Sequence, residues 1–179
     1  MQIQKTRRLA IDAMLAAMYV ALSLVSINLP NMKITLDSLP VLVGAALLGP
    51  LDGLAVGLVG SFINQMLTYG LTVTTSLWII PAGVRGLLVG LYAAKKGFSM
   101  SGRETAFITV ISALVVTALN TAVMYIDSVI FDYYSYVYVF GAMLPRIVAG
   151  VLTAAVFSLL LPTLLAALKK RVLPEKEKR

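Results

Sequence analysis

Two arginines lie inside apolar stretches of this sequence, and they are the residues best suited to bind a ligand. Arg85 and Arg146 each follow a proline near one end of an apolar run. A charge at membrane depth costs at least ~2.5–3.5 kcal/mol on insertion scales, so it normally faces a partner or a water-filled cavity. No acidic residue is expected within a span at the depth of these arginines. Arginine can bind a carboxylate through two parallel hydrogen bonds. The pair therefore predicts a site for an anionic ligand, with extension to the lipid headgroups as the alternative.

Amide and aromatic side chains could complete such a site. An amide in a bilayer interior must find a hydrogen-bond partner, which is either a ligand or another helix. An aromatic ring near the end of a span either stacks on a flat heterocycle or belongs to an interfacial belt. The candidates are the amides Asn64, Gln65 and Asn120 and the aromatic residues Trp78, Tyr69 and Tyr125.

The sequence contains no histidine and no cysteine. This excludes disulfides, imidazole or thiolate metal sites, and catalysis by either residue. The phosphate-loop pattern G-x-x-x-x-G-K-[S/T] is also absent, so ATP hydrolysis is expected only in partner proteins. We therefore expect no catalytic residue, no metal and no cofactor.

The composition is that of an integral membrane protein. Of the 179 residues, 59% are hydrophobic and only 13% are charged, and the mean hydropathy is +0.90. A soluble domain has about 25% charged residues, and a membrane span needs about 20 residues. The sequence predicts an all-α fold, a compact bundle of six transmembrane helices in a single domain. The spans are residues 9–29, 37–49, 53–70, 78–94, 104–126 and 139–168, followed by a basic tail at 169–179.

The basic residues predict the orientation of the bundle. Of the 15 lysines and arginines, 12 lie before the first span, in the 95–103 loop or after the last span. Six spans place these three segments on one side, and the positive-inside rule makes that side cytoplasmic. Both termini should then be cytoplasmic in a multi-pass protein of a prokaryotic plasma membrane. The same pattern explains the net charge of +7 without nucleic acid as a partner. An aromatic loop at 127–138 would lie outside, as a belt or as a lid over the site.

Small residues recur at helical spacing in two spans. Ala13, Ala17 and Ala21 are four residues apart, so they share one face of the first span. Faces of this kind let another membrane helix approach closely. A partner protein or another helix of this chain could occupy the alanine face. A second set of small residues, in the third span, consists of Gly53, Gly57 and Gly60.

The order of these motifs resembles the substrate-binding S component of energy-coupling factor (ECF) vitamin transporters, and most of all the folate family. The resemblance extends over essentially the whole chain. The segments that carry it are the basic N-terminus, the Ala13-xxx-Ala17-xxx-Ala21 face, Lys33–Pro40, Leu48–Gly53 with its Gly-Pro turn, Trp78–Pro81 and Leu144–Arg146.

The resemblance implies a high-affinity binding subunit of an ABC importer that captures its vitamin from outside. Such a subunit docks on a transmembrane T subunit and two ATPases, and the alanine face would contact the T subunit. Folate has two carboxylates for Arg85 and Arg146 and a pterin for the amides and Trp78. Pantothenate, hydroxymethylpyrimidine or a queuosine precursor remain alternatives. So does a self-sufficient transporter, although such carriers usually show intramembrane carboxylates or broken helices.

Overall fold

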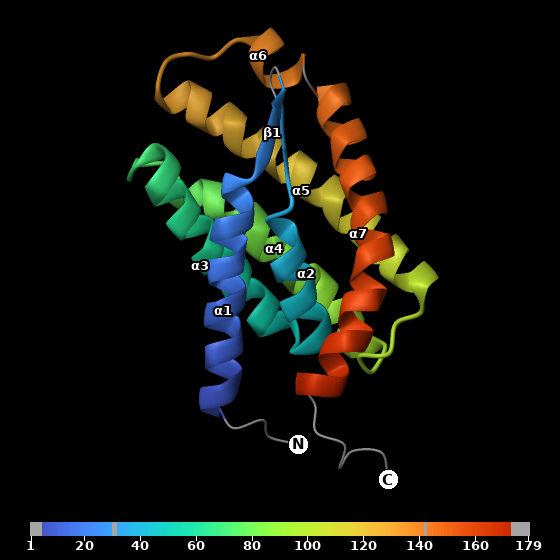
Figure 1. The fold of residues 1–179 in the computed structure, drawn as a ribbon. Helices are drawn as coiled ribbons and strands as arrows, with labels where there is room; N and C mark the ends of the chain where they lie inside the picture. Colours follow the sequence, from blue (N-terminus) through green and yellow to red (C-terminus); the bar gives the residue numbers. More distant parts are fainter. Residues whose placement is uncertain (1–4, 30–31, 142, 173–179) are drawn as a thin grey trace.

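The computed structural model describes residues 5–29, 32–141 and 143–172. Within these residues the chain forms a bundle of six helices of ten residues or more, with one short helix near the end of the chain (Figure 1). This confirms the predicted fold class. The long helices are α1 (Lys5–Leu24), α2 (Ser38–Leu47), α3 (Pro50–Tyr69), α4 (Thr75–Lys95), α5 (Gly102–Ile130) and α7 (Met143–Val172), and the short one is α6 (Tyr136–Phe140). The start of α1 and the end of α7 lie at the same end of the bundle.

A β-hairpin replaces the end of the first predicted span. The span was expected to reach residue 29, but α1 ends at Leu24. Strands β1 (Ser26–Leu29) and β2 (Met32–Thr35) then pair antiparallel, with Ser26 opposite Thr35. The ladder satisfies the backbone groups that a longer helix would have satisfied. The hairpin returns the chain into the bundle at the start of α2.

The later boundaries also differ from the prediction. Helix α5 continues to Ile130, so Asp127 belongs to its last turn and not to the expected 127–138 loop. The helix ends where Asp132 adopts a left-handed φ of 61°. At the other end, Ser101 and Glu104 form a capping box that fixes its start. Helix α7 begins at Met143 and not at residue 139, because α6 occupies the preceding segment.

Three of the described helical segments are long and apolar enough to cross a membrane. They are Thr75–Lys95, Gly102–Ile130 and Tyr136–Lys169. Helix α2 is apolar but has only ten residues, and the first half of α1 carries several charges. The protein is thus a multi-pass membrane protein, while the full six-span topology and its orientation remain predictions.

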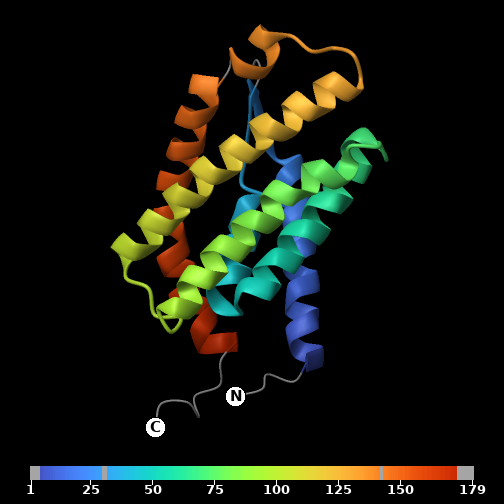
Figure 2. The same ribbon diagram turned by 180° about the vertical axis from the view of Figure 1, so that it is seen from behind.

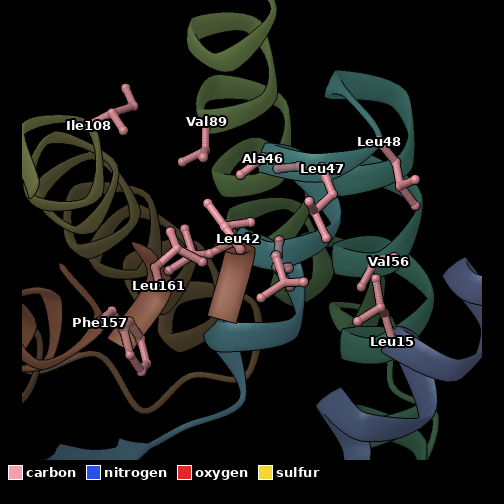
Figure 3. Close-up of a cluster of buried hydrophobic side chains, with 14 of the residues drawn as sticks. Leu15, Leu42, Ala46, Leu47, Leu48, Val56, Val89, Ile108, Phe157 and Leu161 are labelled. Atoms are coloured by element: carbon pink, nitrogen blue, oxygen red, sulfur yellow. The ribbon is translucent and has the colours of Figure 1, made fainter. Parts of the chain in front are cut away.

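Helix α2 lies at the centre of the bundle. Every residue from Pro40 to Leu47 is buried, which explains why this segment is apolar on all sides. Figure 3 shows Leu42 and Ala46 of α2 among Val89 of α4, Phe157 and Leu161 of α7. The short helix therefore serves as the common core of its neighbours.

Helices α3 and α4 lie side by side along most of their length (Figure 2). A Cβ added to Gly86 would lie 2.0 Å from the carbonyl oxygen of Gly53, and one added to Gly57 would lie 2.4 Å from that of Ala82. Only glycine permits such close backbone contact. We call Gly53, Gly57 and Gly86 the glycine seam.

An ion pair ties α1 to the turn between α2 and α3. The Arg8 guanidinium donates to both carboxylate oxygens of Asp52 and, over 2.6 Å, to the carbonyl oxygen of Leu48. Gly49 adopts a φ of 124° in this turn, and Pro50 follows as the first residue of α3. The pair holds the first turns of α1 against the end of the bundle where the chain begins.

Candidate ligand-binding site

A cavity of about 540 Å³ lies between the helices, and every long helix contributes to its wall. Seven of the eight side chains predicted to bind substrate line it. They are Asn64, Gln65, Tyr69, Trp78, Arg85, Asn120 and Arg146. The structure thus brings together residues from α3, α4, α5 and α7 that are up to 82 positions apart in the sequence (146 minus 64).

Arg85 lies one turn after Pro81 in α4, next to the start of α2. Its Nη1 donates to the hydroxyl of Ser38, which in turn donates to Asp37 over 3.1 Å. Asp37 also interacts electrostatically with the guanidinium. The prediction that no acidic group accompanies the arginines is therefore wrong for Arg85. The sequence placed Asp37 at the first residue of the second predicted span, and the hairpin brings it beside α4.

One donor of Arg85 has no partner in the described part of the chain. Its Nε atom is buried and makes no hydrogen bond there. Buried polar groups are almost always paired, and an unpaired one costs about 1–3 kcal/mol, more for a charged group. A polar ligand in the cavity would supply the missing acceptor.

Arg146 lies in the first turn of α7 and contacts the backbone of α6. Its Nη1 lies 3.3 Å from the carbonyl oxygen of Val139, and its Nη2 lies 3.5 Å from that of Tyr138. Tyr138 lines the cavity as well. Arg146 thus links the α6 segment to the cavity wall. Its extension to the lipid headgroups stays a prediction.

All three predicted amides line the cavity, and Asn64 also bonds to a neighbouring helix. Asn64 accepts a hydrogen bond from Ser23 of α1 over 2.7 Å and one from Thr68 over 3.3 Å. It therefore joins α1 to α3 and also lines the cavity. Gln65 and Asn120 line the cavity and are half-buried.

The structure does not place Tyr125 at the cavity, although its neighbour Met124 is there. The ring of Tyr125 is 45% exposed and packs edge-on against Tyr134, with 5.5 Å between the ring centroids. It also contacts Phe140 at 6.5 Å. One residue advances a helix by about 100°, so Tyr125 points away from the wall that Met124 forms.

A carboxylate that the sequence assigned to a loop holds Trp78. The indole Nε1 donates to Asp127 Oδ1 over 3.2 Å. Thr74 donates to the same oxygen, and the hydroxyl of Tyr133 donates to Oδ2. Burial and the hydrogen bond to Asp127 both raise the pKa of Tyr133, so its hydroxyl remains a donor at neutral pH.

Sequence reasoning also missed Tyr19, Asp37 and Ser38, which line the cavity. Tyr19 is buried in α1. A helical projection would have indicated it, because two residues advance a helix by about 200° and place Tyr19 opposite Ala17. No comparable signal exists for Asp37 and Ser38, whose position depends on the hairpin.

Ala13, Ala17 and Ala21 are all exposed on the outer side of α1. Met14 and Met18 lie beside them and are 68% and 50% exposed. The alternative that the alanine face packs inside this bundle is therefore wrong. Contact with a T subunit remains a prediction.

Comparison with known proteins gives the family. The model of the family described as "ECF-type riboflavin transporter, S component" matches residues 3–170. The chain belongs to this family. The family match confirms the resemblance to S components, whereas the folate subfamily finds no support in the comparisons.

Two further comparisons agree with the fold. A solved structure of the S component of a bacterial ECF transporter superposes with a TM-score of 0.68 at 21% identity, covering 93% of this chain and 100% of that one. UPF0397 proteins of Streptococcus pneumoniae strains CGSP14 and G54 are each 39% identical over 80 residues. That match covers 43% of this chain and 42% of each relative, so the chain spans about two-fifths of the length of the curated relatives it matches.

Proposed function

We propose that this protein is the vitamin-binding S component of an ECF-type importer and binds its substrate in the cavity around Arg85. The observation that carries the proposal is the buried Arg85 Nε, which has no partner among the described residues, in a cavity that Trp78 also lines. Together they would bind a polar acceptor and a flat ring in one molecule. The protein itself would catalyse no reaction.

Riboflavin is the first ligand to test. The Asp37 carboxylate accompanies Arg85, so this part of the cavity is less cationic than two isolated arginines would make it. Hydroxyl groups make up much of the remaining polar wall, and they match a polyol chain joined to an uncharged heterocycle. They belong to Ser61, Thr109, Ser112, Thr117 and Thr153.

Folate is the second candidate, because Arg85 and Arg146 line the same cavity. Its two carboxylates would then need one arginine each. Arg146 already contacts the backbone of α6, so folate would have to compete with carbonyl oxygens for that guanidinium. Pantothenate would need only one arginine, and an uncharged queuosine precursor or hydroxymethylpyrimidine would need none.

The energy for transport would come from partners. We propose that the alanine face of α1 docks on a T subunit that carries two ATPases, with both termini on the cytoplasmic side of the plasma membrane. The exposure of Ala13, Ala17 and Ala21 supports this, as does the absence of a phosphate-loop sequence in the chain.

The test is a titration of the purified protein in detergent with riboflavin, folate and pantothenate. Arg85→Ala should weaken binding of the true ligand about 100-fold, as expected when a buried charged hydrogen bond is lost. Arg146→Ala should have an equally large effect only for folate. Arg103→Ala, a change at an exposed arginine, is the matched control. Unchanged binding in Arg85→Ala would overturn the proposed site.

Uptake measurements separate the S component from a self-sufficient transporter. Proteoliposomes that contain only this chain should bind the ligand without accumulating it. Addition of the T subunit and ATPases should give uptake that depends on ATP. Accumulation by the chain alone would contradict the proposal.

A further inference from the structure

Three hydrogen-bond donors from two regions of the chain converge on the carboxylate of Asp127. Thr74 and Trp78 come from the start of α4, and Tyr133 comes from the turn after α5. Thr74 is 1% exposed and Asp127 is 8% exposed, so the carboxylate is removed from solvent. Both of its oxygens accept, which is the arrangement that stabilises a buried carboxylate.

These hydrogen bonds restrain Trp78. An indole has a single donor, Nε1, and here Asp127 Oδ1 accepts from it at 3.2 Å. The ring belongs to the cavity wall, whereas Asp127 does not. A side chain with two rotatable bonds, held at its polar atom, presents a fixed face to whatever fills the cavity.

The same carboxylate joins the two connections at this end of the bundle. Thr74 ends the connection between α3 and α4, and Tyr133 lies in the connection between α5 and α6. Tyr133 further packs edge-on against Tyr138, with 5.6 Å between centroids, and Tyr138 lines the cavity. Asp127 thereby links Trp78 to Tyr138 on the cavity wall.

We propose that Asp127 is a positioning residue of the ligand site, which fixes the Trp78 ring against the bound ligand and holds the two connections together around it. This inference rests on the proposed function, since it assumes that the cavity binds a ligand. Asp127 would act through Trp78 and Tyr133 without contact to the ligand.

Trp78 is the only tryptophan in the sequence, so its fluorescence reports on this position directly. In the ligand-free protein, Asp127→Ala should shift the emission to longer wavelength and increase quenching by acrylamide. Asp127→Asn keeps the Oδ1 acceptor and should restore the wild-type spectrum. Asp132→Asn, which removes an exposed carboxylate from the neighbouring turn, is the matched control and should change nothing. A wild-type spectrum in Asp127→Ala would overturn the positioning role.

Binding gives the second readout, with riboflavin and folate as probes. Asp127→Ala should weaken binding of whichever probe binds about tenfold, as expected for the loss of one hydrogen bond to a charged group. Asp127→Asn should stay within about threefold of the wild type. Equal affinity of Asp127→Ala and the wild type would overturn the proposal, as would an Asn variant that fails as badly as the Ala variant.

A double-mutant cycle tests whether the effect passes through Trp78. Trp78→Phe keeps a ring but removes the indole donor. If Asp127 acts by holding that donor, Asp127→Ala should lose most of its effect in the Trp78→Phe background. A full tenfold loss in that background would show that Asp127 does not act through the Trp78 donor, and would overturn its role in positioning Trp78. If the wild type binds neither probe, the assignment of the ligand fails, while the fluorescence of the ligand-free protein still decides the role of Asp127.

Discussion

Gly53 and Gly57 of α3 are four residues apart, as are the successive alanines of α1, but the two sets have opposite surroundings. The glycine seam on α3 and α4 brings two helix backbones into contact inside the bundle. The alanine face of α1 has the same small-residue pattern, but it is exposed, with Met14 and Met18 beside it. The comparison teaches that the pattern predicts close approach by a helix, and not which helix approaches.

The choice of residue differs between the two sets for a physical reason. At Gly86 the opposing carbonyl oxygen leaves no space for a methyl group, since the two atoms would be 2.0 Å apart. On α1 the opposite face holds the buried residues Leu15, Ala16 and Tyr19, so the alanines need only form a shallow surface. Alanine also favours the helix by about 1 kcal/mol per residue over glycine. Glycine is thus used where a backbone touches, and alanine where the helix face is exposed.

The largest effect should come from the seam. Gly86→Ala must push α3 and α4 apart, because the obstructing atoms at Gly53 belong to the backbone and cannot rotate away. We expect a destabilisation of about 3 kcal/mol, or a melting temperature lower by about 10 °C in detergent. Size-exclusion chromatography after heating would measure this. A melting temperature equal to that of the wild type would show that the helices are not in contact there.

Ala17→Trp should leave stability and ligand binding unchanged and abolish ATP-dependent uptake. The indole would project from an exposed face, where substitutions change stability by about 0.5 kcal/mol or less. Uptake with the T subunit and ATPases, and their co-elution with this chain, are the measurements. Leu159→Trp, at an exposed position of α7, is the matched control and should transport normally. Loss of ligand binding in Ala17→Trp would contradict the separation of the alanine face from the ligand site.

Gly60→Ala should have an intermediate effect, because Gly60 of α3 lies against Tyr19 on the buried face of α1. An added Cβ would lie 2.7 Å from Cγ of Tyr19, so the α1 helix must shift by a few tenths of an ångström or more. We expect a loss of about 1–2 kcal/mol in stability. Because Tyr19 lines the cavity, ligand affinity should fall severalfold in the same variant. Calorimetric titration would measure the ligand affinity, and a thermal melt would measure the stability. A loss of stability without any change of affinity would show that Tyr19 does not contribute to ligand binding.

The smallest effect should be that of Gly102→Ala at the start of α5. Among the described residues, no heavy atom beyond the chain neighbours of Gly102 and the backbone of its own helix lies within 4 Å of the added Cβ. The substitution should raise stability by about 0.5 kcal/mol, since alanine restricts the unfolded chain and favours the helix. The melting temperatures of Gly102→Ala and Gly86→Ala should be compared, because the added methyl group has space at Gly102 and meets a backbone oxygen at Gly86. Destabilisation by more than about 1 kcal/mol would contradict the open space found around Gly102.

Most of the candidate site could be predicted because polar groups are expensive in apolar surroundings. Arg85, Arg146 and the amides stand out in apolar runs, and they converge on one cavity. Tyr125 could not be separated from Met124 in this way, since the sequence does not give the rotation of α5 relative to the bundle. Asp37 and Asp127 were missed as neighbours of Arg85 and Trp78, because they lie where a helix begins or ends. Such boundaries are uncertain by a few residues in any reading of a sequence.

The sequence by itself determined that this is a helical membrane protein. It also gave the candidate polar residues and the two small-residue faces. These follow from local properties, namely hydropathy, spacing and the cost of burying charge. Only the tertiary structure decided that a hairpin brings Asp37 and Ser38 to Arg85, and that Asp127 holds Trp78. It also decided that a neighbouring helix covers the glycine seam, while the alanine face is exposed. Each of these depends on how far one helix turns or ends relative to another, and that is set by the packing of the whole bundle.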